Sequence, residues 1–160
     1  MNTTTYVSAT DTAALIRKAL KEEFAGLRFS VRTEKYRGGA TVFVAWTDGP
    51  QEKAVKAVTE RFEGNRPDVT GDFMDPVSHD VDGEKVHYGA RHIWTERSIS
   101  EATYNAIEPE VLAALELDAP DYGRLYQVPP LVLDSCPGWH YERATIKEFV
   151  RAVANSRAQP

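Results

Sequence analysis

The four histidines and the aspartates near the first of them are the residues of this chain that could bind a metal ion, since imidazole and carboxylate groups are common metal ligands. The histidines are His79, His87, His92 and His140. Their spacing matches no metal-binding motif. His87 and His92 lie five residues apart on an expected strand, where their side chains point to opposite faces. The pattern favours histidines that pack or meet solvent, and we expect neither a metal nor another cofactor.

Two other arrangements could support catalysis, a pair of carboxylates and a thiol near an imidazole. Asp72 and Asp75 could act as general acid and base, but no nucleophile or partner base accompanies them. Cys136 lies four residues before His140, yet the Pro-Gly pair between them predicts a turn, and no third group is placed to hold the imidazole. The sequence also lacks GxSxG, HExxH and a phosphate-binding glycine motif. We therefore expect a protein that is not an enzyme.

The segment 65–84 is the most acidic part of the chain and a candidate binding surface. Arg66 is its single fixed positive charge, and prolines and glycines interrupt it. This composition predicts a solvated loop, which can include a short strand over 69–74. The candidate binding residues are Asp68, Asp72, Asp75, Asp80, Asp82 and Glu84.

A second candidate surface is basic and lies on the first expected strand and the turn after it. Its residues are Arg32, Lys35, Tyr36 and Arg37, and Arg28, Arg91 and Arg97 could line the same side of the sheet or its rim. Cations could contact phosphates, and the tyrosine ring could stack on a base. The alternative is that these charges form the wet face of an edge strand, where they discourage pairing with other chains.

The periodicity of apolar residues predicts the elements that position these groups. Strands are expected over 29–34, 40–47 and 86–95, with Gly38 and Gly39 closing a hairpin between the first two. Helices are expected over about 10–24 and 50–62, from a capping box at 98–101 to about 117, and over about 143–156. Asp48 is expected to cap the second helix. Trp46 and Trp94 each end the apolar face of a strand, so we expect both in the core.

In the last third of the chain, Pro109 is expected to kink or split the third helix. The apolar run 128–133 is expected to pack as an extended segment. The pattern as a whole predicts an α+β fold: a small, mainly antiparallel sheet with helices packed on one face. We expect an α+β core over 1–105 and a C-terminal helical extension, packed on that core, over 106–160.

Length and charge restrict the classes of protein further. The chain has 160 residues and a net charge of −5, which argues against broad, non-specific binding to DNA. No apolar stretch approaches the length of a membrane span, and no leader pattern opens the sequence, so we expect a cytoplasmic protein with no membrane partner. One cysteine cannot form an internal disulfide.

The order of motifs resembles a known family. A helix is followed by the strand FSVR, a Tyr-x-Gly-Gly turn, the strand end WTDGP, a second helix, a Tyr-Gly-x-x-x-Ile strand and an Arg-Ser-x-Ser helix start. This order is similar to the large polyvalent protein-associated domains of phages and conjugative elements, over about Ser8 to Asn105. The resemblance implies a mobile-element setting, in which such proteins are thought to protect or establish incoming DNA. It carries no catalytic residues with it.

Two functions follow as hypotheses. The first is a non-catalytic protein of a phage or plasmid that binds and inhibits a host defence protein or ribonucleoprotein complex, as an anti-CRISPR inhibitor does, with the acidic surface occupying a nucleic-acid channel. The second is a nucleic-acid-binding accessory module that uses the basic surface.

Overall fold

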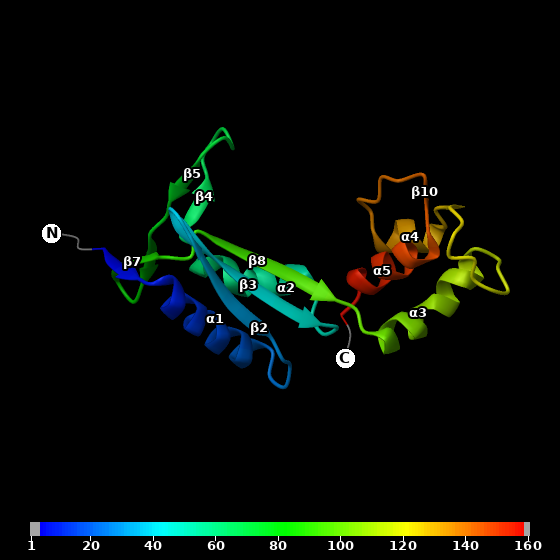
Figure 1. The fold of residues 1–160 in the computed structure, drawn as a ribbon, viewed down its shortest axis with the longest axis horizontal. Helices are drawn as coiled ribbons and strands as arrows, with labels where there is room; N and C mark the ends of the chain where they lie inside the picture. The colour runs from blue at the N-terminus through cyan, green and yellow to red at the C-terminus, as the bar shows by residue number, and fades with distance from the viewer. Residues whose placement is uncertain (1–3, 159–160) are drawn as a thin grey trace. The chain divides into compact units, whose positions relative to one another are not determined.

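The computed structural model describes residues 4–158 (Figure 1). Two compact units are present: the first comprises residues 1–46 and 52–96, and the second comprises residues 47–51 and 97–160. The second unit therefore starts before the boundary at residue 106 that the sequence predicts, and it includes the short corner 47–51. The helices and small sheets confirm the α+β class.

The main sheet of the first unit has three strands in the order β2-β3-β8. β2 (Ser30–Tyr36) and β3 (Gly39–Thr47) form an antiparallel hairpin, in which Ser30 pairs with Ala45 and Tyr36 with Gly39. β8 (His92–Ser98) runs parallel to β3, since the Arg91 amide bonds to Ala40 O at the start of the two strands and their arrows point the same way in Figure 1.

Two helices cover one face of this sheet. α1 (Ala9–Glu23) begins at Ser8, whose hydroxyl accepts a hydrogen bond from the Asp11 amide, as its N-cap position requires. α2 (Glu52–Thr59) continues as the 3-10 helix η1 (Glu60–Phe62). Apolar side chains of the helices and of β3 form a common core, which includes Ile16, Leu20, Val42, Val44, Trp46 and Val55. The predicted layer arrangement and the core position of Trp46 are confirmed.

The third expected strand, 86–95, is two strands with a bend between them. β7 (Glu84–Tyr88) pairs with β1 (Thr5–Val7) and with β6 (His79–Val81), whereas β8 belongs to the main sheet. The bend at 89–91 changes the alternation of faces. Tyr88 and Thr95 are buried, but Trp94 is 62% exposed. The prediction that Trp94 lies in the core is therefore wrong.

The acidic segment 65–84 contains two hairpins. β4 (Asn65–Pro67) pairs with β5 (Met74–Pro76), and β6 pairs with β7. The short strand expected over 69–74 is wrong, because residues 68–73 form the connection between β4 and β5. Gly71 lies there at a φ of 79°, which is outside the conformation of a regular strand.

The second unit is mostly helical. α3 (Glu101–Ala114) contains Pro109 without being split, α4 spans Pro130–Ser135 and α5 spans Ile146–Ser156. β9 (Tyr126–Gln127) and β10 (Arg143–Ala144) form a short antiparallel pair. The expected extended segment 128–133 is thus largely helical. The core of the unit includes Ile107, Val111, Val132, Ile146, Phe149, Val150 and Val153. In residues 4–158, none of the helices is long and apolar enough to span a membrane.

Candidate binding surfaces

The six acidic candidates divide between two hairpins. Asp68, Asp72 and Asp75 belong to the β4–β5 hairpin, and Asp80, Asp82 and Glu84 belong to the β6–β7 hairpin. Both hairpins are parts of the first unit.

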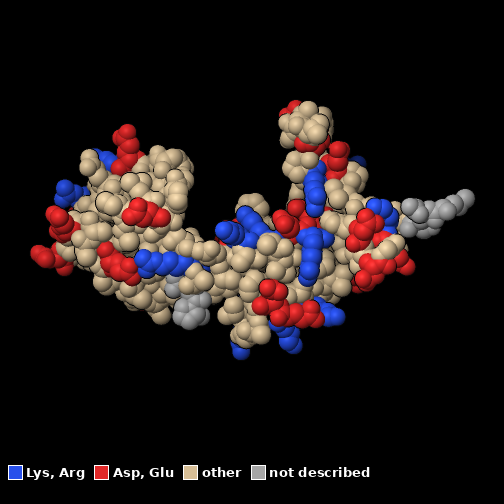
Figure 2. Space-filling model, turned by 180° about the vertical axis from the view of Figure 1, so that it is seen from behind, with Lys and Arg blue, Asp and Glu red and all other residues tan. Residues whose placement is uncertain are grey.

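The β4–β5 hairpin projects from the body of the first unit (Figure 1), and its end is a mostly uncharged knob with acidic atoms beside it in Figure 2. Two apolar side chains explain the uncharged area: Val69 is 105% exposed and Phe73 is 72% exposed. Asp72 and Asp75 are exposed near them. We call these four residues the hairpin tip. Large apolar groups that meet solvent between carboxylates are typical of a surface that contacts another molecule.

Asp68 holds the turn of this hairpin together. Its Oδ1 accepts hydrogen bonds from the amides of Thr70 (3.1 Å) and Phe73 (3.4 Å) and from the Thr70 hydroxyl (2.9 Å). Desolvation raises the pKa of the Asp68 carboxyl, but the hydrogen bonds from Thr70, Phe73 and Gly71 outweigh it, so the pKa lies below its ordinary value. Asp68 therefore stays charged and shapes the tip.

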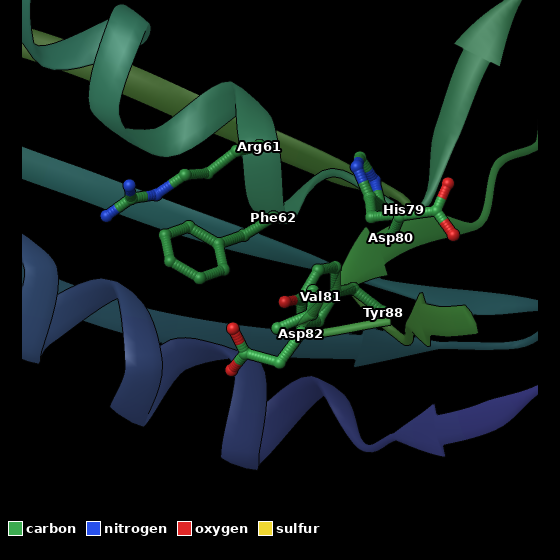
Figure 3. Close-up of a pocket in the computed structure, with 7 residues that line it drawn as sticks. All are labelled: Arg61, Phe62, His79, Asp80, Val81, Asp82 and Tyr88. Atoms are coloured by element: carbon green, nitrogen blue, oxygen red, sulfur yellow. The ribbon is translucent and has the colours of Figure 1, made fainter. Parts of the chain in front are cut away.

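The β6–β7 hairpin borders a pocket of about 390 Å³ with η1 (Figure 3). The pocket is lined by Arg61, Phe62, His79, Asp80, Val81, Asp82 and Tyr88. The Arg61 guanidinium lies 4.9 Å from the centre of the Phe62 ring. Burial raises the pKa of the Tyr88 hydroxyl, and the nearby Arg61 charge opposes that shift. Figure 3 shows the Asp80 carboxylate pointing away from Arg61 and Asp82.

The polar groups of this pocket bind to other parts of the protein. The Asp80 carboxylate accepts a hydrogen bond of 2.9 Å from Lys85 Nζ, and His79 Nε2 lies 2.8 Å from the backbone oxygen of Glu63. No arrangement of nucleophile, base and orienting group is present among the lining residues, so the pocket gives no geometric reason to assign a reaction.

The histidines contact groups of the protein itself, and both His79 and His92 contact Glu63. His87 Nδ1 bonds to Val77 O over 2.9 Å, and His92 Nδ1 lies 3.9 Å from Glu63 Oε1. His140 is exposed. Within residues 4–158, no group of three possible ligands could hold a metal ion. The Cys136 thiol donates to Ala152 O, which is 3.5 Å away, so it does not face His140 in a catalytic pair.

The basic candidates are only partly brought together. Arg32 and Tyr36 lie on the same face of β2, whereas the alternation of the strand puts Lys35 on the opposite face, and Arg37 lies in the turn. The Arg32 guanidinium lies 5.5 Å from the centre of the Phe43 ring on the neighbouring strand. The basic surface expected from the sequence is therefore smaller than predicted.

The same sheet face contains Arg91, which the sequence indicated as a further basic residue, and two rings that it did not indicate, Phe43 and Trp94. Phe43 is half-buried, Trp94 is exposed, and Arg91 lies across Gly39 at the end of the hairpin. A signal for Phe43 was present, since it alternates with buried valines in a sheet with helices on one face. The bend at 89–91 hid the position of Trp94. We call the set Arg32, Tyr36, Phe43, Arg91 and Trp94 the open sheet face.

The corner 47–51 joins the second unit through Arg97. The Arg97 side chain donates hydrogen bonds of 3.0 Å to Asp48 O and to Gly49 O. The prediction that Asp48 caps α2 is wrong, because Asp48 Oδ1 accepts a hydrogen bond of 3.0 Å from the Ser100 amide at the start of α3. The corner is thus a structural element, and we assign no ligand to it.

Comparison with known proteins gives one match. The family model of large polyvalent protein associated domain 29 matches residues 7–100, which is more than half of the chain. The comparisons with curated proteins and with solved structures found no match.

Proposed function

This chain belongs to the large polyvalent protein associated domain 29 family, and from that premise we propose that it is a non-catalytic protein of a mobile genetic element that binds a host protein complex. The observation that carries the proposal is the hairpin tip, where Val69 and Phe73 are exposed next to Asp72 and Asp75. The binding step is the docking of this tip on a partner surface that is apolar at its centre and basic around it.

The energetics of the tip favour docking. Burying a valine or phenylalanine side chain is worth roughly 1.5–3 kcal/mol, and in the free protein neither side chain obtains this gain, since both face solvent. An aromatic anchor surrounded by charge is a common arrangement at the centre of a protein interface. The carboxylates of Asp72 and Asp75 would pair with lysine or arginine side chains of the partner and would speed association at low salt.

The kind of partner follows from the charge and from the setting of the family. A basic surface with apolar pockets is typical of proteins that bind nucleic acid. The mobile-element setting implied by the family points to host defence proteins and their ribonucleoprotein complexes among such targets. We propose that the chain occupies such a surface and inhibits it stoichiometrically, in the manner of an anti-CRISPR protein, within the host cytoplasm.

The test is a plasmid-transformation assay in a host that carries an active DNA-targeting defence system. Expression of the full chain is expected to raise the number of transformants above the empty-vector level. A Val69→Ser, Phe73→Ser double variant is expected to lose this effect. Leu125→Ser is the matched control, since Leu125 is an apolar residue of the second unit that is 49% exposed, and it should act like the wild type.

A second measurement identifies the surface. The defence complex should co-purify with the tagged wild type and with Leu125→Ser, but not with the double variant. Neutralising the tip with Asp72→Asn and Asp75→Asn should weaken the complex and reduce its salt dependence. If the double variant inhibits and co-purifies like the wild type, the hairpin tip is not the binding surface. If the wild type leaves defence intact in each host, the proposed function is wrong.

A further inference from the structure

The face of the main sheet opposite α1 and α2 presents aromatic and basic side chains in rows across the strands. In the hairpin register, Arg32 lies opposite Phe43 and Tyr36 lies opposite Gly39. Ile93 packs with the core and Thr95 is buried, so the alternation of β8 turns Trp94 to the other face, on the strand that follows β3 in the sheet. Arg32 and Phe43 are therefore direct neighbours, and Trp94 lies on the same face of the adjacent strand.

The rings of this face are accessible. Trp94 is 62% exposed and Tyr36 is 46% exposed, and Phe43 is half-buried beneath the Arg32 guanidinium. A tryptophan ring on a sheet face does not stabilise the fold by burial while it is exposed to water. Its position suits a ligand that supplies another flat surface.

The cations of this face are held by the protein in extended positions. The Arg91 Nη1 atom donates a hydrogen bond of 2.8 Å to Gly38 O. Its aliphatic stem crosses Gly39 so closely that a Cβ atom built there would lie 2.2 Å from Arg91 Cδ. Gly39 thus lets Arg91 lie flat along the row that also contains Tyr36. Arg32 is fixed above Phe43 by the cation–π contact.

Aromatic rings next to arginine side chains on one open sheet are complementary to a ligand that carries both flat bases and phosphates. Bases stack on aromatic side chains in proteins that bind single strands, and arginine side chains neutralise the phosphates. A duplex keeps its bases stacked on each other and cannot offer their faces to Trp94 and Phe43. The chemistry of the face therefore selects a single strand over a duplex.

We propose that the open sheet face binds single-stranded nucleic acid, with bases stacked on Trp94 and Phe43 and with phosphates paired to Arg32 and Arg91. This site uses other residues than the hairpin tip and does not depend on the function proposed for it. The alternation of β2 and β8 puts Glu34 and Glu96 on the same face. Their carboxylates would repel the phosphates of the bound nucleic acid. Removing one of them should tighten binding.

The experiment is fluorescence anisotropy with the full chain and two labelled probes, a 15-residue oligo(dT) strand and a duplex of equal length, over a series of salt concentrations. The wild type should bind the single strand at low salt and bind it more tightly than the duplex. Trp94→Ala should weaken that binding by at least fivefold, and Trp94→Phe should restore most of it, because a ring remains. Arg32→Gln should lower the slope of log affinity against log salt by roughly 0.7.

Two variants test the sign and the location of the effect. Glu34→Gln should increase affinity for oligo(dT), a result that loss of folding cannot imitate. Tyr141→Ala removes a ring of the second unit that is 57% exposed, and it should leave the affinity unchanged. Absence of binding at low salt, equal binding of strand and duplex, or full binding by Trp94→Ala would each overturn the proposal. Loss of defence inhibition in the hairpin variant with oligo(dT) binding intact would separate the two sites.

Discussion

The guanidinium group of Arg97 donates a hydrogen bond of 3.0 Å to the backbone oxygen of Asp48. It also donates to the oxygen of Ala154, at 3.2 Å, in the last turn of α5. Ala154 O also accepts the Arg157 amide at 3.2 Å, so Arg97 is a second donor to the end of α5 and bonds carbonyl groups of the corner 47–51 at the same time. Gln51 adds a hydrogen bond from its side-chain amide to Ser156 O. This cluster fixes the corner inside the second unit.

Replacement of Arg97 should therefore destabilise the second unit. Arg97→Ala removes the donor from several partly buried carbonyl groups, and we expect the free energy of unfolding to fall by roughly 2–4 kcal/mol. Arg97→Lys should recover part of the lost stability, because lysine keeps a charged donor. The recovery should be incomplete, because one ammonium group cannot bond to all of these oxygens together. Urea denaturation, followed by the amide hydrogen exchange of α5, measures the change. Arg151→Ala, at an exposed position of α5, is the control; equal effects of both alanine variants would contradict the role of Arg97.

The stability of the second unit should also decrease at acidic pH through Asp48. Desolvation raises the pKa of the Asp48 carboxyl, but hydrogen bonds from Ser100 and Thr103 and the Arg97 charge outweigh it, so the folded-state pKa lies below its ordinary value of 3.8. A carboxyl with a depressed pKa contributes stability above its unfolded-state pKa, and that contribution disappears as pH falls through the folded-state pKa. We expect the urea concentration at the midpoint of unfolding to fall as the pH is lowered from about 5 to about 3. This is the pH range in which carboxyl groups of ordinary pKa begin to protonate.

Asp48→Asn is the variant that tests this assignment. Asp48 has a φ of 56°, and asparagine tolerates this left-handed conformation nearly as well as aspartate does. The variant should be less stable than the wild type at pH 7 and should differ less from it at pH 3. A constant difference between the two proteins over this pH range would show that the Asp48 charge does not contribute.

Sequence periodicity predicted the elements whose faces repeat without interruption. The apolar stripes of α1, α2 and α5 and the alternation of β2 and β3 gave the layer of helices on one sheet face. Prediction failed at Trp94, because the bend at 89–91 shifts the phase by one residue, although Gly89 inside the strand pattern is a local signal of such a bend. Prediction also failed at Asp48, because its carboxylate accepts a hydrogen bond from the Ser100 amide, which is 52 residues away in the sequence. Contacts between segments far apart in sequence leave no periodic signal.

Fewer features of the candidate surfaces than of the helices and strands could be predicted from the sequence. The acidic composition of 65–84 correctly indicated exposed carboxylates, but the exposure of Val69 and Phe73 depends on the turn that Asp68 closes. Arg32 and Tyr36 were indicated by their charge and ring, but Phe43 and Trp94, which lie on the same sheet face, were not. The alternation around Phe43 could have identified it, since a three-stranded sheet with helices on one face leaves the other face open.

Gly64 should not tolerate a side chain. A Cβ atom at this position would lie 1.9 Å from the backbone oxygen of Tyr88 and 3.1 Å from that of Ala90. Backbone atoms of a paired strand cannot move aside as a flexible side chain can, and the Gly64 amide itself bonds to Ala90 O over 2.7 Å. We expect Gly64→Ala to destabilise the first unit by about 3 kcal/mol or more.

The matched control for Gly64 is Gly123→Ala. A Cβ atom at Gly123 would meet one side-chain oxygen of Asp121 at an ordinary distance of 3.5 Å, so this variant should stay within about 0.5 kcal/mol of the wild type. Thermal unfolding by circular dichroism compares the two. Equal stability of the two variants would mean that β7 and the segment before β4 are not packed as closely as described.

The shape of the hairpin tip should depend on Asp68 and not on Asp72. The Asp68 carboxylate accepts hydrogen bonds from Thr70 and from the Phe73 amide, whereas the side chain of Asp72 is exposed in the connection. Asp68→Ala removes these acceptors but keeps the apolar residues of the tip, so the turn should open while β2 and β3 stay intact. Amide hydrogen exchange of residues 70–73 should become faster in Asp68→Ala and stay unchanged in Asp72→Ala.

The same comparison links the turn to binding. If the partner recognises Val69 and Phe73 in the geometry that Asp68 fixes, Asp68→Ala should weaken co-purification of the defence complex although both apolar side chains remain, since the ordering of the turn then has to occur on binding. Asp72→Ala should weaken co-purification only through the loss of a surface charge. Its effect should therefore be no larger than the effect of raising the salt concentration on the wild type. Fast exchange at 70–73 together with undiminished binding would mean that the partner contacts the tip without requiring its turn.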